Sequence, residues 1–139
     1  MKFLIDTNVV SELRKKRPDS AVIVWVNGLG VDDVHLSVLT VGELRAGAAR
    51  LAARGDEVAA RALTVWIEGL VEQYEDQVLP VTAAVADRWG ALNSVRPMPA
   101  VDSLLAATAL EHGLTVSTRN TKDFASTGVD VYNPFSSEA

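Results

Sequence analysis

Residues 2–8 read KFLIDTN, a short apolar run that stops at an acid. Residues 2–5, of which Phe3, Leu4 and Ile5 are apolar, have the composition of a short buried strand. Asp6 ends this run, and the two residues that follow it are of types that often cap helices. We therefore predict a strand over 2–5 and a helix over 9–16. The helix should end before Pro18, because proline disfavours the helical conformation of the residue before it.

The rest of the chain repeats this alternation of short apolar segments and helices. Further strands are predicted at 34–38, 77–80, 114–117 and 129–132. Helices are predicted at 21–29, 40–54, from the Gly55-Asp56 break to 74, 82–95 and 101–112, with a single turn at 121–125. Strands that alternate with helices form a parallel sheet covered by helices on both faces. The expected fold class is α/β, with one domain over 1–134 and a flexible tail over 135–139.

The composition excludes several kinds of site. With 139 residues, the chain is long enough for one domain with its own core. The absence of cysteine excludes disulfides, thiolate zinc sites, iron–sulfur clusters and a cysteine nucleophile, and two histidines are too few for a three-histidine metal site. The N-terminal apolar run is broken by Asp6, and no segment approaches the roughly 18 apolar residues of a membrane span. We therefore expect a cytoplasmic protein without membrane contact.

Four carboxylates stand out because they border or interrupt apolar segments, whereas most other acids lie in polar runs. Asp6 ends the first strand, and Asp123 follows the strand at 114–117. Glu43 lies within SVLTVGEL, and Asp102 lies within PAVDSLLAATAL. The chain has no glycine-rich phosphate loop, no GxGxxG motif after a strand and no GxSxG elbow. These acids are therefore the main candidates for chemistry.

Each of these acids also has a structural explanation. Asp6 can start a turn and stabilise the next helix. Glu43 lies three residues after a threonine, which is the spacing of a capping box. Asp102 lies in the first turn of a helix, where an acid favours the helix dipole, and Asp123 lies three residues after an asparagine, as in another helix cap. Taken singly, the four positions leave the structural and the chemical interpretation open.

Taken together, the four acids predict a metal site. In a parallel sheet, the carboxyl ends of the strands and the starts of the following helices share one edge, where such folds bind ligands. Four carboxylates on that edge would repel one another strongly without a cation. Their hard oxygen atoms suit Mg²⁺, with Mn²⁺ as a substitute, and such an ion can activate water and orient a phosphodiester. The reaction class that follows is metal-dependent hydrolysis of phosphoryl or phosphodiester bonds.

Four segments, FLIDTNVVSEL, SVLTVGELRAG, MPAVDSLLAATALEHGL and VSTRNTKDF, together resemble the PIN-domain toxins of bacterial VapBC toxin–antitoxin pairs. The resemblance covers residues 2 to about 134 and implies a single PIN-like domain that acts as an Mg²⁺-dependent endoribonuclease. It carries over the acidic catalytic residues Asp6, Glu43, Asp102 and Asp123 and the supporting residues Asn8, Thr118 and Asn120. We expect Asp6 and Asp102 to be the main metal ligands, while Asp123 binds the metal directly or through water.

The same resemblance implies three partners. These are an RNA substrate, a second copy of the chain in a homodimer, and a cognate VapB-type antitoxin that blocks the acidic site. A stripe of small residues would let helices pack closely, either between two copies or within one copy, and consists of Gly42, Ala46, Ala49 and Ala53. Two other functions stay open: a PIN nuclease in RNA processing or DNA repair, and an interaction module without catalysis.

The net charge first argues against a nucleic-acid substrate. The chain has 18 acidic and 13 basic residues, a balance of −5, whereas contacts to phosphates need basic side chains. The four candidate site acids contribute −4 of this charge, and without them 14 acidic residues face 13 basic ones. The acidic balance is therefore compatible with RNA that approaches through bound metal and local basic patches.

Overall fold

The computed structural model describes residues 1–136, and residues 137–139 lie outside the described part. Within 1–136, one sheet contains the strands β1 (Phe3–Ile5), β2 (Val34–Ser37), β3 (Val78–Leu79), β4 (Thr115–Ser117) and β5 (Val131–Tyr132). The strand order is β3-β2-β1-β4-β5, and all neighbouring strands are parallel. The predicted α/β fold with a parallel sheet is confirmed.

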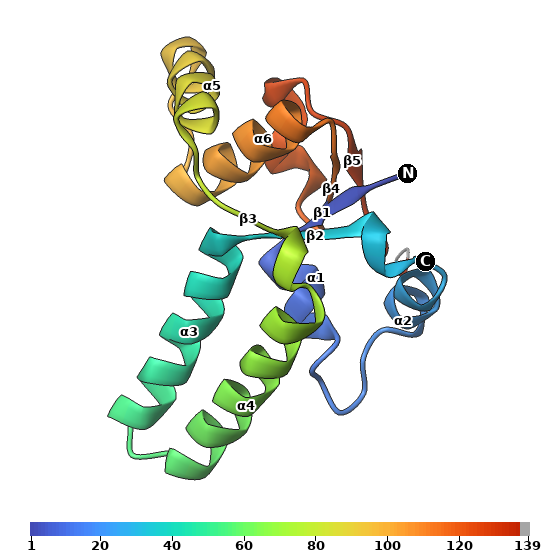
Figure 1. Ribbon diagram of the computed structural model, residues 1–139, viewed down its shortest axis with the longest axis vertical. Coiled ribbons are helices and arrows are strands. Elements are labelled where there is room, and N and C mark those ends of the chain that lie inside the picture. Colours follow the sequence, from blue (N-terminus) through green and yellow to red (C-terminus); the bar gives the residue numbers. More distant parts are fainter. Residues whose placement is uncertain (137–139) are drawn as a thin grey trace.

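Helices cover both faces of this sheet (Figure 1). One face carries α1 (Thr7–Glu12), α2 (Ser20–Asn27), α3 (Val38–Ala53) and α4 (Glu57–Gln73), and the other carries α5 (Ala83–Val95) and α6 (Ala100–His112). Short 3-10 helices lie at η1 (Val31–Asp33), η2 (Glu75–Gln77) and η3 (Thr121–Thr127). The long helices α3 and α4 form a hairpin that projects away from the sheet (Figure 1). Across residues 1–136, no helix has the length and hydropathy needed to cross a bilayer.

The three residues of β1 show how the sequence builds both layers. Successive side chains of a strand point to opposite faces of the sheet. Phe3 and Ile5 pack in a core with α1 to α4, whereas Leu4 packs in a second core with α6 and β4. All three side chains are buried, because β1 is the central strand and both of its faces are covered.

The strand β1 also lies where the order of the sheet reverses. The chain adds β2 and β3 on one side of β1, then returns to add β4 and β5 on its other side. Open α/β sheets bind ligands outside the carboxyl ends of the strands at such a reversal. Ile5 of β1 pairs with Ser117 of β4, so the next residues, Asp6 and Thr118, leave the sheet side by side.

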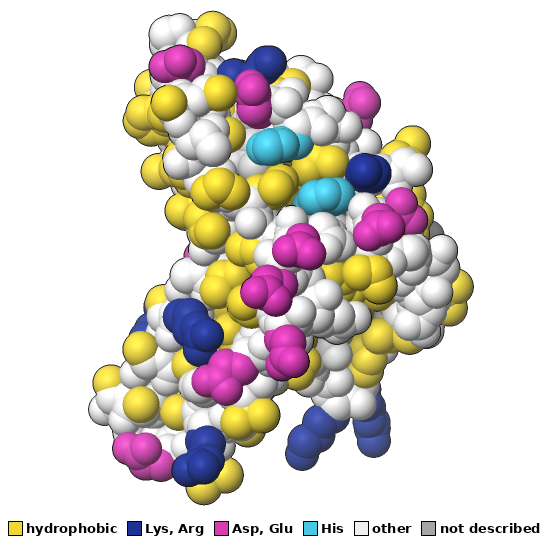
Figure 2. All heavy atoms as spheres, viewed as in Figure 1, with side chains coloured by type: hydrophobic (Ala, Val, Ile, Leu, Met, Phe, Trp, Pro, Cys, Tyr) yellow, Lys and Arg dark blue, Asp and Glu magenta, His cyan; other side chains and the backbone are white. Residues whose placement is uncertain are grey.

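The first helix is shorter than the sequence predicts, since α1 ends at Glu12 rather than at residue 16. After Leu13 come four exposed basic residues, 14–17, which offer no apolar side chain for packing. A short helix depends on such packing, and neighbouring like charges oppose it. These residues form a loop between α1 and α2 instead, and the loop lies in the lower part of the molecule in Figure 1. In the same view, Figure 2 shows Lys and Arg side chains that project into solvent at that place.

The start of α3 corrects the interpretation of Glu43 as part of a capping box. The cap is Ser37, whose hydroxyl accepts a hydrogen bond from the backbone N–H of Leu39 at 3.0 Å. Thr40 is fully buried inside the helix, and its hydroxyl has no hydrogen-bond partner within residues 1–136. Thr40 therefore caps nothing, and the structural explanation for Glu43 is wrong.

The small-residue stripe of α3 faces outward. All four of its residues are exposed, namely Gly42, Ala46, Ala49 and Ala53. The same helix packs against the core through other side chains, among them Leu44 and Ala48. The interpretation of the stripe as a packing surface within one copy is therefore wrong.

The chain is still packed beyond the domain boundary predicted at residue 134. Phe135 is buried, and the guanidinium carbon of Arg119 lies 4.4 Å from the centre of its ring. Ser136 donates two hydrogen bonds to Asp19, one from its backbone N–H and one from its hydroxyl. Residues 135 and 136 of the expected tail thus contact the domain, and the remainder of that tail lies outside the described residues.

Candidate active site

Asp6 is held at the junction between β1 and α1. Its backbone N–H extends the sheet by donating to the carbonyl of Ser117 at 2.9 Å. Its side chain caps α1, because Oδ1 accepts from the backbone N–H of Thr7 at 2.7 Å. Only 7% of Asp6 is exposed. The carboxylate therefore lies just beneath the surface, at the point where the strand order reverses.

Two polar side chains hold the other oxygen of Asp6. The hydroxyl of Thr118 donates to Oδ2 at 2.8 Å, and Asn8 Nδ2 donates to the same atom at 3.4 Å. The Thr118 oxygen accepts from Asn8 Nδ2 at 3.3 Å and from the backbone N–H of Asn120 at 3.0 Å. Asn8 Oδ1 accepts from the backbone N–H of Arg119 at 3.1 Å. Because a hydroxyl donates one proton and accepts at two lone pairs, the orientation of Thr118 is fully determined.

Glu43 reaches the same region from the helix that follows the neighbouring strand β2. It lies in the second turn of α3, which begins directly after β2. Its Oε1 accepts a hydrogen bond from the hydroxyl of Thr7 at 2.7 Å. Thr7 thus contacts two of the four acids, Asp6 through its backbone N–H and Glu43 through its hydroxyl. The sequence gives no signal for this role of Thr7, because the two partners lie 36 residues apart.

The other two acids come from α6 and η3. Asp102 is half-buried in the first turn of α6, and Asp123 is exposed in the first turn of η3. Asn120 precedes η3 but makes no capping bond with its side chain, so the predicted cap at Asp123 is absent from the described structure. Asn120 contributes to the site through its backbone N–H, which contacts the hydroxyl of Thr118.

The four carboxylates act on one another electrostatically. Burial raises the pKa of Asp6, although the hydrogen bonds that its side chain accepts act in the opposite direction. The charges of Glu43 and Asp123 raise the pKa of Asp6 further. Burial also raises the pKa of Asp102, and so do the charges of the other three acids. The fold therefore brings all four acids into one region, although their sequence positions span almost the whole chain.

This set of side chains suits a hard divalent cation. The carboxylates supply oxygen ligands, and a cation would relieve the repulsion that contributes to the raised pKa values. As the side chains stand in residues 1–136, however, no three acidic or histidine groups are close enough together to hold one ion. Mg²⁺ is often bound by only two protein carboxylates, with water at its other coordination positions. That arrangement fits the distances between these acids better than a site in which protein side chains supply every ligand.

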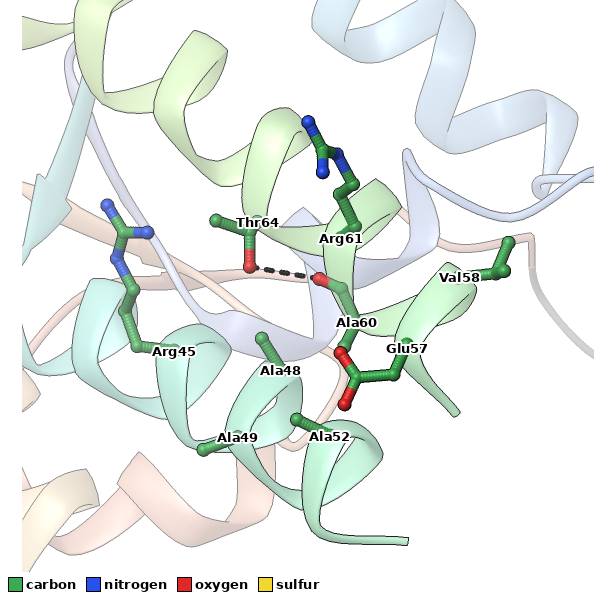
Figure 3. Close-up of a pocket in the computed structure, with 9 residues that line it drawn as sticks. All are labelled: Arg45, Ala48, Ala49, Ala52, Glu57, Val58, Ala60, Arg61 and Thr64. Carbon is green, nitrogen blue, oxygen red and sulfur yellow. Dashed lines mark hydrogen bonds between the residues drawn. The ribbon is translucent and has the colours of Figure 1, made fainter. Parts of the chain in front are cut away.

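A groove lies between α3 and α4 (Figure 3). Its floor is formed by alanine side chains, and the charged groups along it come from Arg45, Glu57 and Arg61. None of the four candidate acids or their hydrogen-bond partners lines it. The groove therefore lacks the chemistry of the candidate site.

Asp102→Asn is expected to leave the melting temperature of the metal-free protein at neutral pH unchanged or higher. The folded-state pKa of Asp102 is raised above its usual value of 3.8, so the wild-type chain loses stability as the pH rises from that value through the raised pKa. The variant has no such penalty. Melting curves of both proteins from about pH 4 to about pH 7.5 should therefore separate as the pH increases. A variant several degrees less stable at neutral pH would give Asp102 a purely structural role in α6.

Comparisons with known proteins identify the family. A family model described as PIN domain matches residues 3–129. The chain is 35% identical to toxin FitB of Neisseria gonorrhoeae, over 96% of this chain and 98% of that protein. It is 34% identical to VapC ribonuclease Y4jK of Sinorhizobium fredii, over 96% of this chain and 97% of that protein.

A solved structure shows the same architecture. The crystal structure of FitAcB from Neisseria gonorrhoeae superposes with a TM-score of 0.87 at 35% identity, over 95% of this chain and 97% of that chain. The family match includes strands β1 to β4 and all four candidate acids. The chain therefore belongs to the PIN-domain family.

Proposed function

We propose that this protein is the toxin of a type II toxin–antitoxin pair and acts as an Mg²⁺-dependent endoribonuclease. The observation that carries the proposal is the state of Asp6, a nearly buried carboxylate fixed by hydrogen bonds, whose pKa is raised by burial and by the charges of Glu43 and Asp123. Membership of the PIN-domain family supports a nuclease, and the relatives named a toxin and a ribonuclease support this particular class.

In this proposal, Asp6 and Asp102 are the Mg²⁺ ligands, and Mn²⁺ can replace Mg²⁺. Burial and the charges of neighbouring acids raise the pKa of both carboxyls, so the protein alone stabilises their charged forms poorly. Glu43 and Asp123 complete the acidic group, with Asp123 acting directly or through water. When bound, the ion would supply Lewis acidity for the phosphodiester and a lowered pKa for the attacking water.

The supporting residues keep Asp6 in one orientation. Thr118 and Asn8 contact one carboxylate oxygen, and the backbone N–H of Thr7 contacts the other. The backbone N–H of Asn120 holds Thr118 in turn. Such partners prepare a ligand for its metal, because the side chain needs no reordering when the ion binds.

RNA would be repelled by these carboxylates until a cation is bound. Local attraction would come from exposed basic side chains near the start of the chain, along α3 and directly after it, namely residues 14–17, Arg45, Arg50 and Arg54. One of them, Lys15, is already paired with Glu12 at 2.8 Å. Because few basic groups contribute, we expect general affinity for RNA to be weak and sensitive to salt.

A nuclease toxin must be held inactive in the cell that makes it. We therefore expect a cognate VapB-type antitoxin to block the acidic site, and we expect the protein to act in the cytoplasm, where RNA is available. We also expect a homodimer, for which the outward-facing small residues of α3 offer a surface that allows close approach.

Expression of this protein alone is expected to arrest growth, and expression together with the gene adjacent to its own should restore growth if that gene encodes the antitoxin. Mapping of new RNA ends after induction should reveal defined cut sites that disappear when the neighbouring gene is expressed. A matched strain that carries Asp6→Asn controls for the burden of expression.

The alternative functions give different results. A PIN nuclease of RNA processing or DNA repair would cleave nucleic acid in vitro without arresting growth, and the neighbouring gene would have no effect. An interaction module without catalysis would produce no cut sites under any condition. Either result would contradict the proposed toxin function.

A further inference from the structure

We propose that Thr7 is a positioning residue, whose hydroxyl holds Glu43 ready for the metal. This inference rests on the proposed function of the same site. Its basis is the position of Thr7 between two acids that come from different elements. The backbone N–H of Thr7 donates to Asp6 Oδ1 at 2.7 Å, and its hydroxyl donates to Glu43 Oε1 at 2.7 Å. A single residue thereby fixes the position of Glu43 relative to Asp6.

Thr7 is held in a well-packed part of the molecule. It is the first residue of α1, and the neighbouring Val9 and Val10 are almost completely buried in the core. A threonine side chain also has few rotamers, because its Cβ is branched. The hydroxyl of Thr7 is therefore a fixed donor.

Glu43 has little else to hold it. The residue is exposed, and its carboxylate accepts no other side-chain or capping hydrogen bond within the described chain. A distance of 2.7 Å is typical of a hydroxyl bound to a charged carboxylate. Without this contact, a cation would have to order a long and mobile side chain, and the lost rotamer freedom would weaken binding.

The fold itself does not use this hydroxyl. The cap of α1 is formed by the side chain of Asp6 and the backbone N–H of Thr7, which every non-proline residue supplies. Thr7→Val keeps the branched Cβ and the cap, and removes only the bond to Glu43. Its effect on metal binding can therefore be separated from an effect on folding.

The test is a titration of Mg²⁺ or Mn²⁺ into the metal-free protein, followed by calorimetry. Thr7→Val should bind the ion about 10-fold more weakly than the wild type, the lower end of the loss seen when a hydrogen-bonding partner around a metal site is removed. Thr7→Ser retains the hydroxyl and should restore most of the affinity. Thr64→Val is the matched control, because the Thr64 hydroxyl contacts the carbonyl of Ala60 within α4, and its affinity should equal that of the wild type.

Cleavage assays should show the same separation. The Mg²⁺ concentration for half-maximal RNA cleavage should rise about 10-fold in Thr7→Val, while the rate at saturating Mg²⁺ stays close to that of the wild type. Melting curves without metal check that the variant is folded. Should Thr7→Val melt early, Thr7→Ala also lacks the hydroxyl and provides the same comparison.

A double-mutant cycle with Glu43→Ala tests whether Thr7 acts through Glu43. In the Glu43→Ala background, adding Thr7→Val should cause no further loss of metal affinity. A further 10-fold loss in that background would overturn the inference, and so would wild-type affinity in Thr7→Val alone. A wild-type protein that binds neither ion and cleaves no RNA would overturn the proposed function instead, which is a distinct result.

Discussion

Asp6→Asn is expected to lower Mg²⁺-dependent RNA cleavage by at least about 100-fold, the upper end of the loss seen when only a supporting partner of a metal ligand is removed. The change replaces a charged oxygen ligand with a neutral amide at the centre of the proposed site. Asparagine can still accept the backbone N–H of Thr7 and so keep the cap of α1. The measurement is the initial rate of cleavage of a defined RNA at fixed Mg²⁺, with the melting temperature recorded in parallel.

Asp56→Asn is the matched control for this prediction. Asp56 caps α4 by accepting from the backbone N–H of Ala59 at 3.1 Å, and it is exposed. The control therefore removes the same charge from the same kind of helix start, away from the acidic region, and should cleave at the wild-type rate. Full activity in Asp6→Asn would remove Asp6 from the metal site.

Removal of divalent ions is expected to reduce RNA cleavage to the level of a blank without protein. Without a cation, the negative phosphodiester meets uncompensated carboxylates, and no described histidine or cysteine is available at the site to replace the ion in catalysis. Adding Mg²⁺ or Mn²⁺ in excess of the chelator should restore cleavage. Cleavage by the same preparation is thus measured before chelation, in the presence of chelator and after the ion is restored.

Circular dichroism during chelation separates loss of the ion from loss of the fold. The sheet and both cores are formed by protein contacts alone, so the far-ultraviolet spectrum should not change when the ion is removed. Cleavage that continues undiminished in excess chelator would contradict a metal-dependent reaction.

The layered fold could be predicted because its signals are local. FLI at residues 3–5 is apolar on both faces, as a central parallel strand requires, and each of the helices α2 to α5 begins after a capping Asp, Ser or Thr. Asp6 was identifiable for the same reason, since it ends that strand. Its side chain caps α1, so the structural explanation of Asp6 is confirmed, and its role as a metal ligand stays a prediction.

The details that could not be predicted depend on contacts across the fold. Thr40 matched the capping pattern in sequence, but packing of α3 against the core buried it and left Ser37 as the cap. The bonds from Thr7 to Glu43 and from Thr118 to Asp6 join residues 36 and 112 positions apart. Such partners are brought together by the order of strands in the sheet, which local patterns do not encode.

Calorimetric titration of Mg²⁺ into metal-free wild-type protein and into Asp102→Asn tests whether acids from separate elements form one metal site. Asp102 is suited to this comparison because its side chain caps no helix. The wild-type protein should bind Mg²⁺, and the variant should bind it at least about 10-fold more weakly while remaining folded. Equal binding by the two proteins, or no binding by either, would contradict a shared carboxylate site for Mg²⁺.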